Sequence, residues 1–389
     1  MLLFLFWALS IPAVLAALTS WYAGRRHLRA VSEAMLHPPA AWAPLATLIV
    51  PIKGLEDHLA SNLRSLTAQD YPDYELLIAV RDPADPALEL VRPLLNDRIR
   101  LVIAGPVRPD TGEKIHNLLA AVEAARPASR VLAFADSDGC VEPDWLRGLV
   151  APLQDPAVGA ATGYRWYFPE RARLPPLLRT VWNSTIAGNF GVGSPRFVWG
   201  GATALRRETF RSARVVEYWQ GAVSDDYRLT DALRAAGLQI RFAPQAMVAT
   251  PGDCSLREFI AWAVRQMIIT RVYAPRLWWS GFTAHVVYCA AMAAGVAVLA
   301  SGRWWALAIL LLTVIPGAWR GDLRRRAARL LFPGRAAWLD RHGWACSWLT
   351  LPVTWIWLYT FLASALRRTI EWRGHRYRLI APSRTERLA

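Results

Sequence analysis

Residues 131–139 read Val-Leu-Ala-Phe-Ala-Asp-Ser-Asp-Gly, an apolar stretch that ends in two carboxylates one residue apart. The apolar run predicts a buried strand, and open α/β sheets bind ligands at the carboxyl ends of their strands. In an extended chain Asp136 and Asp138 point to the same side, so both can reach one divalent cation. The stretch therefore predicts a site where a metal ion binds a substrate diphosphate. The alternative is that the two acids only end the strand and cap a turn.

Short apolar runs and helical patterns alternate along the same part of the chain. Strands are expected at 45–50, 74–80, 99–104 and 131–135, and helices at 57–68, 86–95 and 114–125. This alternation predicts an α/β fold with a doubly wound, mostly parallel sheet. Beyond residue 150 the pattern is less regular. It suggests strands at 164–168 and 198–205, an amphipathic helix at 174–187 and a further helix at 226–236.

Long uncharged stretches predict a membrane protein. They cover residues 1–24, 277–302, 304–319 and 343–366. The first stretch has no positive residues before it, so it indicates a membrane anchor rather than a signal peptide. The first cations follow it at Arg25 and Arg26, which places the polar region after it in the cytosol.

The number of membrane crossings is open. Four crossings would leave the Arg-rich C-terminal segment outside, against the positive-inside tendency. Either 304–319, which is only sixteen residues long and contains Pro316, or 343–366, which contains Pro352, fails to cross. Otherwise the C-terminal segment is an exception to the rule.

The net charge of +15 points to lipid rather than to nucleic acid. Seven arginines fall within 320–341 and seven more within 367–387, and both segments flank apolar runs. Anionic lipid headgroups are therefore the expected partner, and no nucleic acid is expected. Only two of the 45 cationic residues are lysines, Lys53 and Lys114, and both follow strand-like runs. A need for a compact ammonium at these places and chance are equally good explanations.

Two further acidic motifs invite a functional interpretation. Asp225 and Asp226 stand together at the start of a predicted helix, where one acid is enough for a cap. Their mutual repulsion would help to keep one of them a base near neutral pH. Asp82 and Asp85 lie in a Pro-rich turn, where capping of the backbone is favoured and hydrogen bonding to a nucleotide is the alternative.

Seven segments resemble ceramide glucosyltransferases, from about residue 44 to the C-terminus. They are Pro51-Ile-Lys-Gly54, Asp70-Tyr-Pro-Asp-Tyr-Glu75, Val80-Arg-Asp-Pro-Ala-Asp-Pro-Ala87, Lys114-Ile-His-Asn-Leu118, Ala135-Asp-Ser-Asp138, Ser224-Asp-Asp-Tyr227 and Glu371-Trp-Arg-Gly-His-Arg-Tyr-Arg378. The resemblance implies a membrane-anchored, inverting glycosyltransferase with a GT-A fold. It makes Asp82 (or Asp85) the first acid of the family pattern, Asp136 with Asp138 the second, and Asp226 the third.

The sequence departs from the family in two places. The final family motif is (Q/R)xxRW, whereas residues 262–266 read Trp-Ala-Val-Arg-Gln and keep only Arg265. Animal ceramide enzymes have a lone acid followed by Ser-Gly, whereas this chain has a full Asp-x-Asp. The doubled acid strengthens the expectation that the protein chelates a metal directly.

The resemblance implies transfer of a hexose, with glucose the first candidate, from a UDP-sugar to the hydroxyl of a membrane lipid, with ceramide the first candidate. The cofactor is Mg²⁺ or Mn²⁺. The expected catalytic residues are Asp226, Asp225 and Arg265, and the expected metal ligands are Asp138 and Asp136. The expected contacts with the nucleotide sugar are Lys53, Asp82, Asp85, Lys114, Asp136, Gly200 and Gly201. Trp262 and Gln266 are expected at the acceptor or at the membrane interface.

The implied organisation has five parts: an anchor at 1–24, a GT-A domain at 44–250, interfacial helices with the Trp-x-x-Arg-Gln motif at 251–280, transmembrane segments at 281–366 and a basic tail at 367–389. The bacterial inner membrane, with the catalytic domain in the cytosol, is the expected location.

Three alternatives stay open. The same chemistry could act on a hopanoid or on diacylglycerol, or it could extend a polysaccharide, which would need a translocating pore. A membrane transporter or scaffold that binds nucleotide without chemistry would leave the UDP-sugar intact. Transport is disfavoured because, apart from Cys and Tyr, His285 is the only ionisable residue in the apolar runs.

Overall fold

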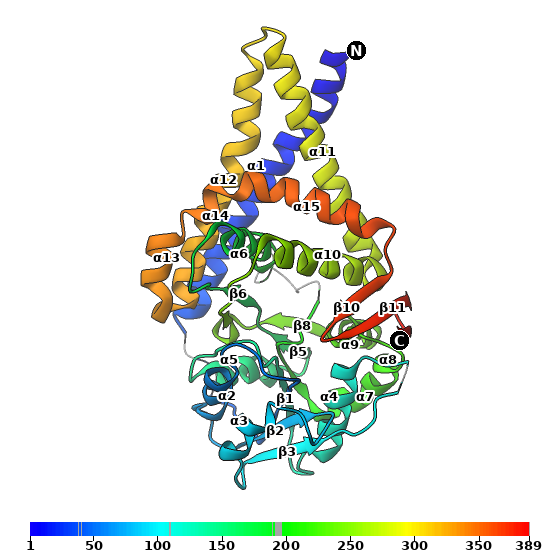
Figure 1. The fold of residues 1–389 in the computed structure, drawn as a ribbon. Helices are drawn as coiled ribbons and strands as arrows, with labels where there is room; N and C mark the ends of the chain where they lie inside the picture. The colour runs from blue at the N-terminus through cyan, green and yellow to red at the C-terminus, as the bar shows by residue number, and fades with distance from the viewer. Residues whose placement is uncertain (38, 40, 109, 189, 191–196, 389) are drawn as a thin grey trace. The chain divides into compact units, whose positions relative to one another are not determined.

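The computed structural model describes residues 1–37, 39, 41–108, 110–188, 190 and 197–388 (Figure 1). The chain forms two compact units, each built from segments that are far apart in the sequence. Unit 1 comprises Met1–Ala34, Pro169–Val192 and Gly252–Arg367, and unit 2 comprises Met35–Phe168, Gly193–Pro251 and Arg368–Ala389.

A seven-stranded sheet in the order β3-β2-β1-β4-β7-β5-β8 forms the centre of unit 2 (Figure 1). Its strands are β1 (Ala46–Pro51), β2 (Tyr74–Val80), β3 (Ile99–Ile103), β4 (Val131–Ala135), β5 (Val158–Thr162), β7 (Ala202–Arg206) and β8 (Gln239–Phe242). Strands β1 to β4 pair in parallel, as do β5 and β8, and β7 runs antiparallel to β4 and β5. The predicted mostly parallel α/β sheet is confirmed.

The helices of unit 2 follow the predicted alternation. They are α2 (Leu59–Thr67), α3 (Leu88–Val91), α4 (Glu113–Ala124), α5 (Trp145–Val150), α7 (Arg207–Ser212), α8 (Val215–Trp219) and α9 (Asp225–Ala235). Short 3₁₀ turns add η1 (Arg92–Leu94), η2 (Ala151–Gln154) and η3 (Pro244–Ala246). The helix expected at 86–95 is split into α3 and η1, because Pro93 offers no N–H and disfavours helical geometry at Arg92.

The order of the central strands fixes the position of a ligand site. Every residue of β2, β4 and β5 is buried, as expected for strands that are covered on both faces. From β1 the chain continues to β2 and β3 on one side, and β4 lies on the other. Such a reversal leaves a crevice at the carboxyl ends of β1 and β4, and Asp136 follows β4 directly.

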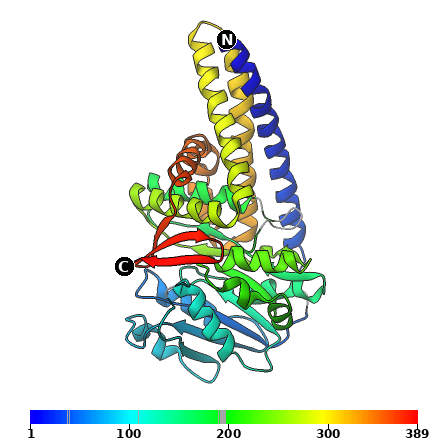
Figure 2. The same ribbon diagram turned by 90° about the vertical axis from the view of Figure 1, so that its right-hand side faces the viewer.

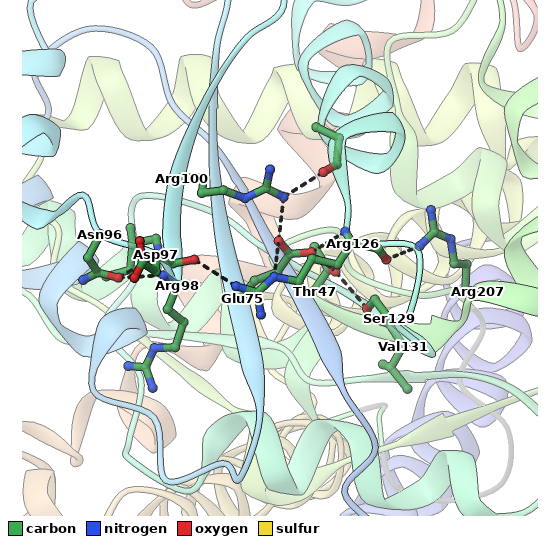
Figure 3. Close-up of polar contacts among 12 residues, drawn as sticks. Thr47, Glu75, Asn96, Asp97, Arg98, Arg100, Arg126, Ser129, Val131 and Arg207 are labelled. Carbon is green, nitrogen blue, oxygen red and sulfur yellow. Dashed lines mark hydrogen bonds and ion pairs between the residues drawn. The ribbon is translucent and has the colours of Figure 1, made fainter.

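A buried carboxylate lies at the opposite, amino end of the strands. Glu75, near the start of β2, is fully buried, and its oxygens lie 2.7 Å from the Thr47 hydroxyl and 2.6 Å from the Arg100 guanidinium. The backbone N–H of Arg126 donates a third hydrogen bond of 2.6 Å. Figure 3 shows these groups converging on Glu75 from neighbouring segments. The resemblance of the segment around Glu75 therefore reflects a structural network rather than a ligand contact.

We expect Glu75→Gln to destabilise unit 2 by about 2 kcal/mol, because it weakens the charge-assisted hydrogen bonds that the fully buried carboxylate accepts from Thr47, Arg100 and the Arg126 N–H. The midpoint of thermal unfolding of the purified protein measures this loss. Asp70→Asn is the matched control, since Asp70 is exposed and lies 3.5 Å from Arg147 in a surface pair. Equal unfolding midpoints for the two variants would contradict the expectation.

Two small sheets complete unit 2. Strands β6 (Arg165–Tyr167) and β9 (Val248–Thr250) pair in parallel. Strands β10 (Thr369–Trp372), β11 (His375–Ala381) and β12 (Arg384–Leu388) form an antiparallel sheet. The basic segment that follows the last helix is thus folded, and it belongs to the same unit as the main sheet.

Unit 1 is helical. Its helices are α1 (Leu2–Met35, which runs one residue into unit 2), α6 (Leu174–Ala187), α10 (Leu256–Tyr273), α11 (Pro275–Ala300), α12 (Ala306–Leu331), α13 (Ala336–His342), α14 (Ala345–Trp348) and α15 (Thr350–Ala365), with the 3₁₀ turn η4 (Pro333–Arg335) before α13. By length and composition, α1, α11 and α12 could cross a membrane. They run alongside one another in Figure 2. Trp7 of α1 stacks on Trp305, the residue before α12, at 5.4 Å between ring centroids. Helix α15 has 16 residues and spans about 24 Å, less than a bilayer core of about 30 Å.

The stretch 343–366 is divided between α14 and α15, and neither helix is among the candidate spans in the described part of the chain. The segments on both sides of residues 252–367 belong to unit 2, an arrangement that two crossings between them, by α11 and α12, would allow.

Candidate functional site

Charged side chains gather at the carboxyl edge of the main sheet. Lys114, in the first turn of α4, places its Nζ 2.8 Å from Oδ1 of Asp136 and 3.2 Å from Oδ1 of Asp225. Arg165 of β6 donates to both acids of the Asp-x-Asp motif, at 2.9 Å to Asp136 and 2.8 Å to Asp138. The structure therefore brings the second and third acidic motifs together around two cations.

The two cations keep Asp136 ionised. Burial opposes its charge, but the Lys114 ammonium and the Arg165 guanidinium outweigh burial and hold the pKa of this carboxyl below its usual range. Burial opposes the charge of Lys114, but the carboxylates of Asp136 and Asp225 outweigh burial and raise the pKa of this lysine above its usual value. Asp136 therefore serves as an anion at any physiological pH.

The pKa values of the two acids at the start of α9, Asp225 and Asp226, are raised rather than lowered. Burial raises the pKa of Asp225 to about 6, helped by the charges of Asp226 and Asp136 and opposed by Lys114. Burial also raises the pKa of Asp226, although hydrogen bonds from Ser224 and from the Tyr227 N–H oppose this shift. Ser224 is the N-cap of α9, so the cap alone does not explain the two acids.

Gly200 and Gly201 lie directly against the acids. A Cβ on Gly200 would stand 2.2 Å from Oδ2 of Asp225, and one on Gly201 would stand 2.6 Å from Oδ2 of Asp136. Trp199 adds a tight contact of 2.3 Å to the position of a Cβ on Gly201. Any side chain at these two positions would displace the carboxylates of Asp225 and Asp136. Glycine is therefore needed at both positions to keep the acids where they are.

The Asp-x-Asp pair fits a divalent cation that is shared with a substrate. Oδ1 of Asp138 is buried and makes no hydrogen bond within the described part of the chain. A buried oxygen of this kind requires a partner, and carboxylate oxygens are the ligands that Mg²⁺ and Mn²⁺ prefer. Among the described residues, no three His, Cys, Asp or Glu side chains converge on one point. Substrate oxygens would therefore have to complete the coordination.

Both lysines of the chain take part in ion pairs beside the site. Lys53, just after β1, places its Nζ 3.1 Å from Oε2 of Glu113, the residue before Lys114. Arg81 also approaches Oε2 of Glu113, at 3.5 Å. The contacts show that a cation is used at each position, although a guanidinium also pairs with Glu113, as Arg81 does.

Asp82 and Asp85 cap the backbone. Asp85 accepts hydrogen bonds from the N–H groups of Gly54 and Ala87, at 3.0 and 2.9 Å, and so ties the loop after β1 to the loop after β2. Asp82 accepts from the N–H of Ala84 at 2.9 Å, and half of its side chain is exposed. Asp82 therefore has free surface for a ligand, whereas Asp85 has a clear structural role.

Trp262, Arg265 and Gln266 belong to unit 1, on α10, whereas all the other predicted site residues belong to unit 2. The Trp262 ring meets Trp182 edge-on at 5.1 Å between centroids, and Trp182 stacks on Trp357 at 3.8 Å. Trp262 is thus part of an apolar cluster of unit 1. Arg265 and Gln266 are half-buried on the same helix.

Several residues around the acids escaped the sequence analysis. Arg165 was a detectable signal, as the only charge in the apolar segment 163–168. Glu113 and Glu56 carried no such signal, because single acids in loops and helix starts are common. Arg373 and His375, the two residues from the C-terminal sheet that contact these acids, lie in the segment 371–378 that resembles the family. They received no role there because they are more than 200 positions from Glu56 and Glu113 in the sequence.

A mostly parallel sheet with an Asp-x-Asp pair after β4 and a second acidic pair on α9 defines the domain as a GT-A glycosyltransferase fold. The family model for glycosyl transferase family 21 matches residues 5–384, and the chain belongs to this family.

Individual relatives are distant. Ceramide glucosyltransferase 1 of Caenorhabditis elegans is 24% identical over 233 residues, which cover 57% of this chain and 48% of that protein. The chain thus spans about half the length of this curated relative. A solved structure of the mannosyltransferase PcManGT from Pyrobaculum calidifontis, in complex with GDP-Man and Mn²⁺, has a TM-score of 0.54 at 19% identity and covers 93% of this chain and 98% of that chain. This likeness supports the fold.

Proposed function

We propose that this protein transfers a hexose from a UDP-sugar to the hydroxyl of a membrane lipid, with glucose and ceramide as the first candidates. Membership of family 21 supports sugar transfer, and the single observation that carries the site is the convergence of the two acidic pairs on Lys114. The lipid acceptor is favoured by the three long apolar helices of unit 1.

Asp226 is the proposed catalytic base. Of the two acids on α9 it is the more exposed, while Asp225 is buried against Lys114. Asp226 would take the proton of the acceptor hydroxyl as its oxygen attacks the anomeric carbon and the bond from that carbon to the diphosphate breaks. One displacement inverts the anomeric centre, so an α-linked donor yields a β-glycoside.

Asp138 and Asp136 would hold Mg²⁺ or Mn²⁺, which would stabilise the charge of the departing nucleoside diphosphate. Lys53, Lys114 and Asp82 are proposed to line the nucleotide-sugar side of the site, with Gly200 and Gly201 preserving its shape. Arg265 is proposed to neutralise the diphosphate, and Trp262 and Gln266 are proposed to serve the acceptor side.

We further propose that unit 2 lies on the cytosolic face of a bacterial inner membrane. The support is the arginines in the last third of α1, in the second half of α12 and after α15, which the positive-inside rule places in the cytosol. An acceptor held in the same membrane would meet the site by lateral diffusion, which replaces a three-dimensional search by a local one.

Lipid mass spectrometry tests the proposal directly. The full chain is expressed in a host that lacks glycolipids, and its membranes are supplied with UDP-glucose, other UDP-sugars or GDP-mannose, together with ceramide, diacylglycerol or a hopanoid. GDP-mannose is included because the structural relative PcManGT was solved with it. A new lipid carrying one hexose, absent with Asp226→Asn, is expected. Only polymeric products would favour a polysaccharide synthase, and intact donor in every combination would reject transfer.

The acid limb of the pH profile is expected to report the ionisation of Asp226. Asp226 must be ionised to act as a base, and burial raises its pKa, so kcat/KM should begin to fall at a higher pH than for an ordinary aspartate. In Asp225→Asn the neighbouring negative charge is lost, the pKa of Asp226 falls and the acid limb should move to lower pH. An unchanged limb in this variant would argue against coupling of the two acids.

A further inference from the structure

The C-terminal sheet contacts three of the segments that carry the proposed site. The first contact runs through Arg373, at the turn between β10 and β11, which forms an ion pair with Glu56 in the loop after β1. Glu56 in turn accepts a hydrogen bond of 2.7 Å from the hydroxyl of Ser137, the residue between Asp136 and Asp138. The carboxylate of Glu56 thus links Arg373 to the loop that carries Asp136 and Asp138.

The turn between β10 and β11 has a strained backbone at Arg373. Arg373 and Gly374 both have positive φ, at 52° and 74°, and they form the two-residue connection between the paired residues Trp372 and His375. Turns of this geometry favour Asn or Gly at the first position, and a long side chain there is uncommon. The ion pair with Glu56 offsets the strain and gives a reason for an arginine at this position.

The second contact runs through His375. Its Nε2 lies 2.7 Å from Oε2 of Glu113 and also 2.7 Å from Nζ of Lys53, and Arg387 of β12 donates to its Nδ1 at 2.9 Å. His375 thus joins Glu113, Lys53 and Arg387 in one polar cluster. Glu113 precedes Lys114, so the contact between His375 and Glu113 fixes the first turn of α4, from which Lys114 reaches Asp136 and Asp225.

The third contact reaches the segment before α9. Gly221 has φ of +69°, and a Cβ on it would stand 2.1 Å from the carbonyl oxygen of Ser383, in the turn between β11 and β12. The next residue, Ala222, accepts a hydrogen bond of 2.9 Å from the N–H of Gly112, just before α4. The segment that leads to Asp225 and Asp226 is therefore packed against both α4 and the C-terminal sheet.

We propose that strands β10–β12 are a positioning element of the active site, in which Arg373 holds the Asp-x-Asp loop through Glu56 and His375 holds Lys114 through Glu113. The inference rests on the proposed function for its kinetic consequences, but its structural part stands independently. The sheet acts by keeping the metal-binding acids and the lysine in their places before the donor arrives. Such pre-organisation lowers the cost of ordering the site on binding.

Arg373→Asn is the most informative variant, because asparagine suits the left-handed turn and should preserve or improve folding while removing the pair with Glu56. We expect the Kd for UDP in the presence of Mn²⁺, and the KM for the donor, to rise by about tenfold, as for loss of an outer partner of a metal ligand, with little change in kcat. Arg373→Lys should restore most of the affinity. Arg376→Gln is the control, since Arg376 lies on the exposed face of β11.

Hydrogen exchange followed by mass spectrometry gives a readout that does not depend on catalysis. In Arg373→Asn, protection of residues 134–140 should fall, and in His375→Ala that of residues 113–118 should fall, relative to Arg376→Gln. The positioning role is overturned if both segments keep their protection and UDP with Mn²⁺ binds Arg373→Asn as tightly as the control. If the unaltered protein transfers no sugar but these protections fall, the proposed function fails while the positioning role stands.

Discussion

Asp226→Asn is expected to abolish sugar transfer, with a loss of about 10³-fold in kcat, because the amide cannot take the proton of the acceptor hydroxyl. Binding of UDP with Mn²⁺ should stay within about threefold of the unaltered protein, since a near-isosteric amide keeps the start of α9 intact and Asp226 is not a proposed metal ligand. Single-turnover transfer and titration of UDP measure the two effects separately.

Asp231→Asn is the matched control for this variant. Asp231 lies on the same helix α9, partly exposed, and pairs with Arg228 at 2.9 Å. It should keep nearly full activity. If Asp226→Asn retains more than a few per cent of turnover, the base is another group, and Asp225 would be the next residue to test.

Asp138→Ala is expected to remove metal-dependent binding of UDP. Its Oδ1 is the buried oxygen that makes no hydrogen bond in the described part of the chain, and its Oδ2 contacts Arg165. Loss of a direct ligand should weaken the binding of Mn²⁺ with UDP by at least about 100-fold, the upper range for outer partners of metal ligands. Calorimetric titration of UDP with and without Mn²⁺ checks this expectation.

Asp144→Ala controls for a general loss of negative charge near β4. Asp144 is exposed, a few residues beyond the Asp-x-Asp pair, and its side chain makes no capping hydrogen bond at the start of α5. Its titration should match that of the unaltered protein. Identical titrations for Asp138→Ala would exclude chelation by Asp138 and would assign the acid a role in holding Arg165.

The parallel half of the sheet was predictable because its strands are continuous apolar runs separated by helical patterns. The strands β5 and β8 were not predicted. Residues 158–162 read Val-Gly-Ala-Ala-Thr, too small and short to stand out, and β8 alternates buried and exposed residues over only four positions. Strands β5 and β8 join the rest of the sheet through β7, which lies between β4 and β5. Long-range contacts place β7 there, and no local pattern encodes them.

The candidate site was predictable where acids stand in pairs, as at Asp136 and Asp138 or Asp225 and Asp226. The cations that hold them were harder to find. Lys114 was marked by the rarity of lysine in this chain. Arg165 was marked only as a lone charge in an apolar segment, and its role became clear when the structure placed it against both acids. The link from the C-terminal sheet was beyond prediction, because it joins Glu113 to His375 across the whole helical segment.

The discontinuous make-up of unit 2 has a consequence for how the protein is made. A ribosome synthesises α1 first, then the main sheet with α6 between its strands, then the helices α10 to α15, and only afterwards residues 368–388, which complete unit 2. Domains generally fold in the order of their synthesis, so the main sheet must wait, without strands β10–β12, until the helices α10 to α15 have been made. If those strands position the acids as proposed, the nascent chain binds the donor weakly until residues 368–388 have been made.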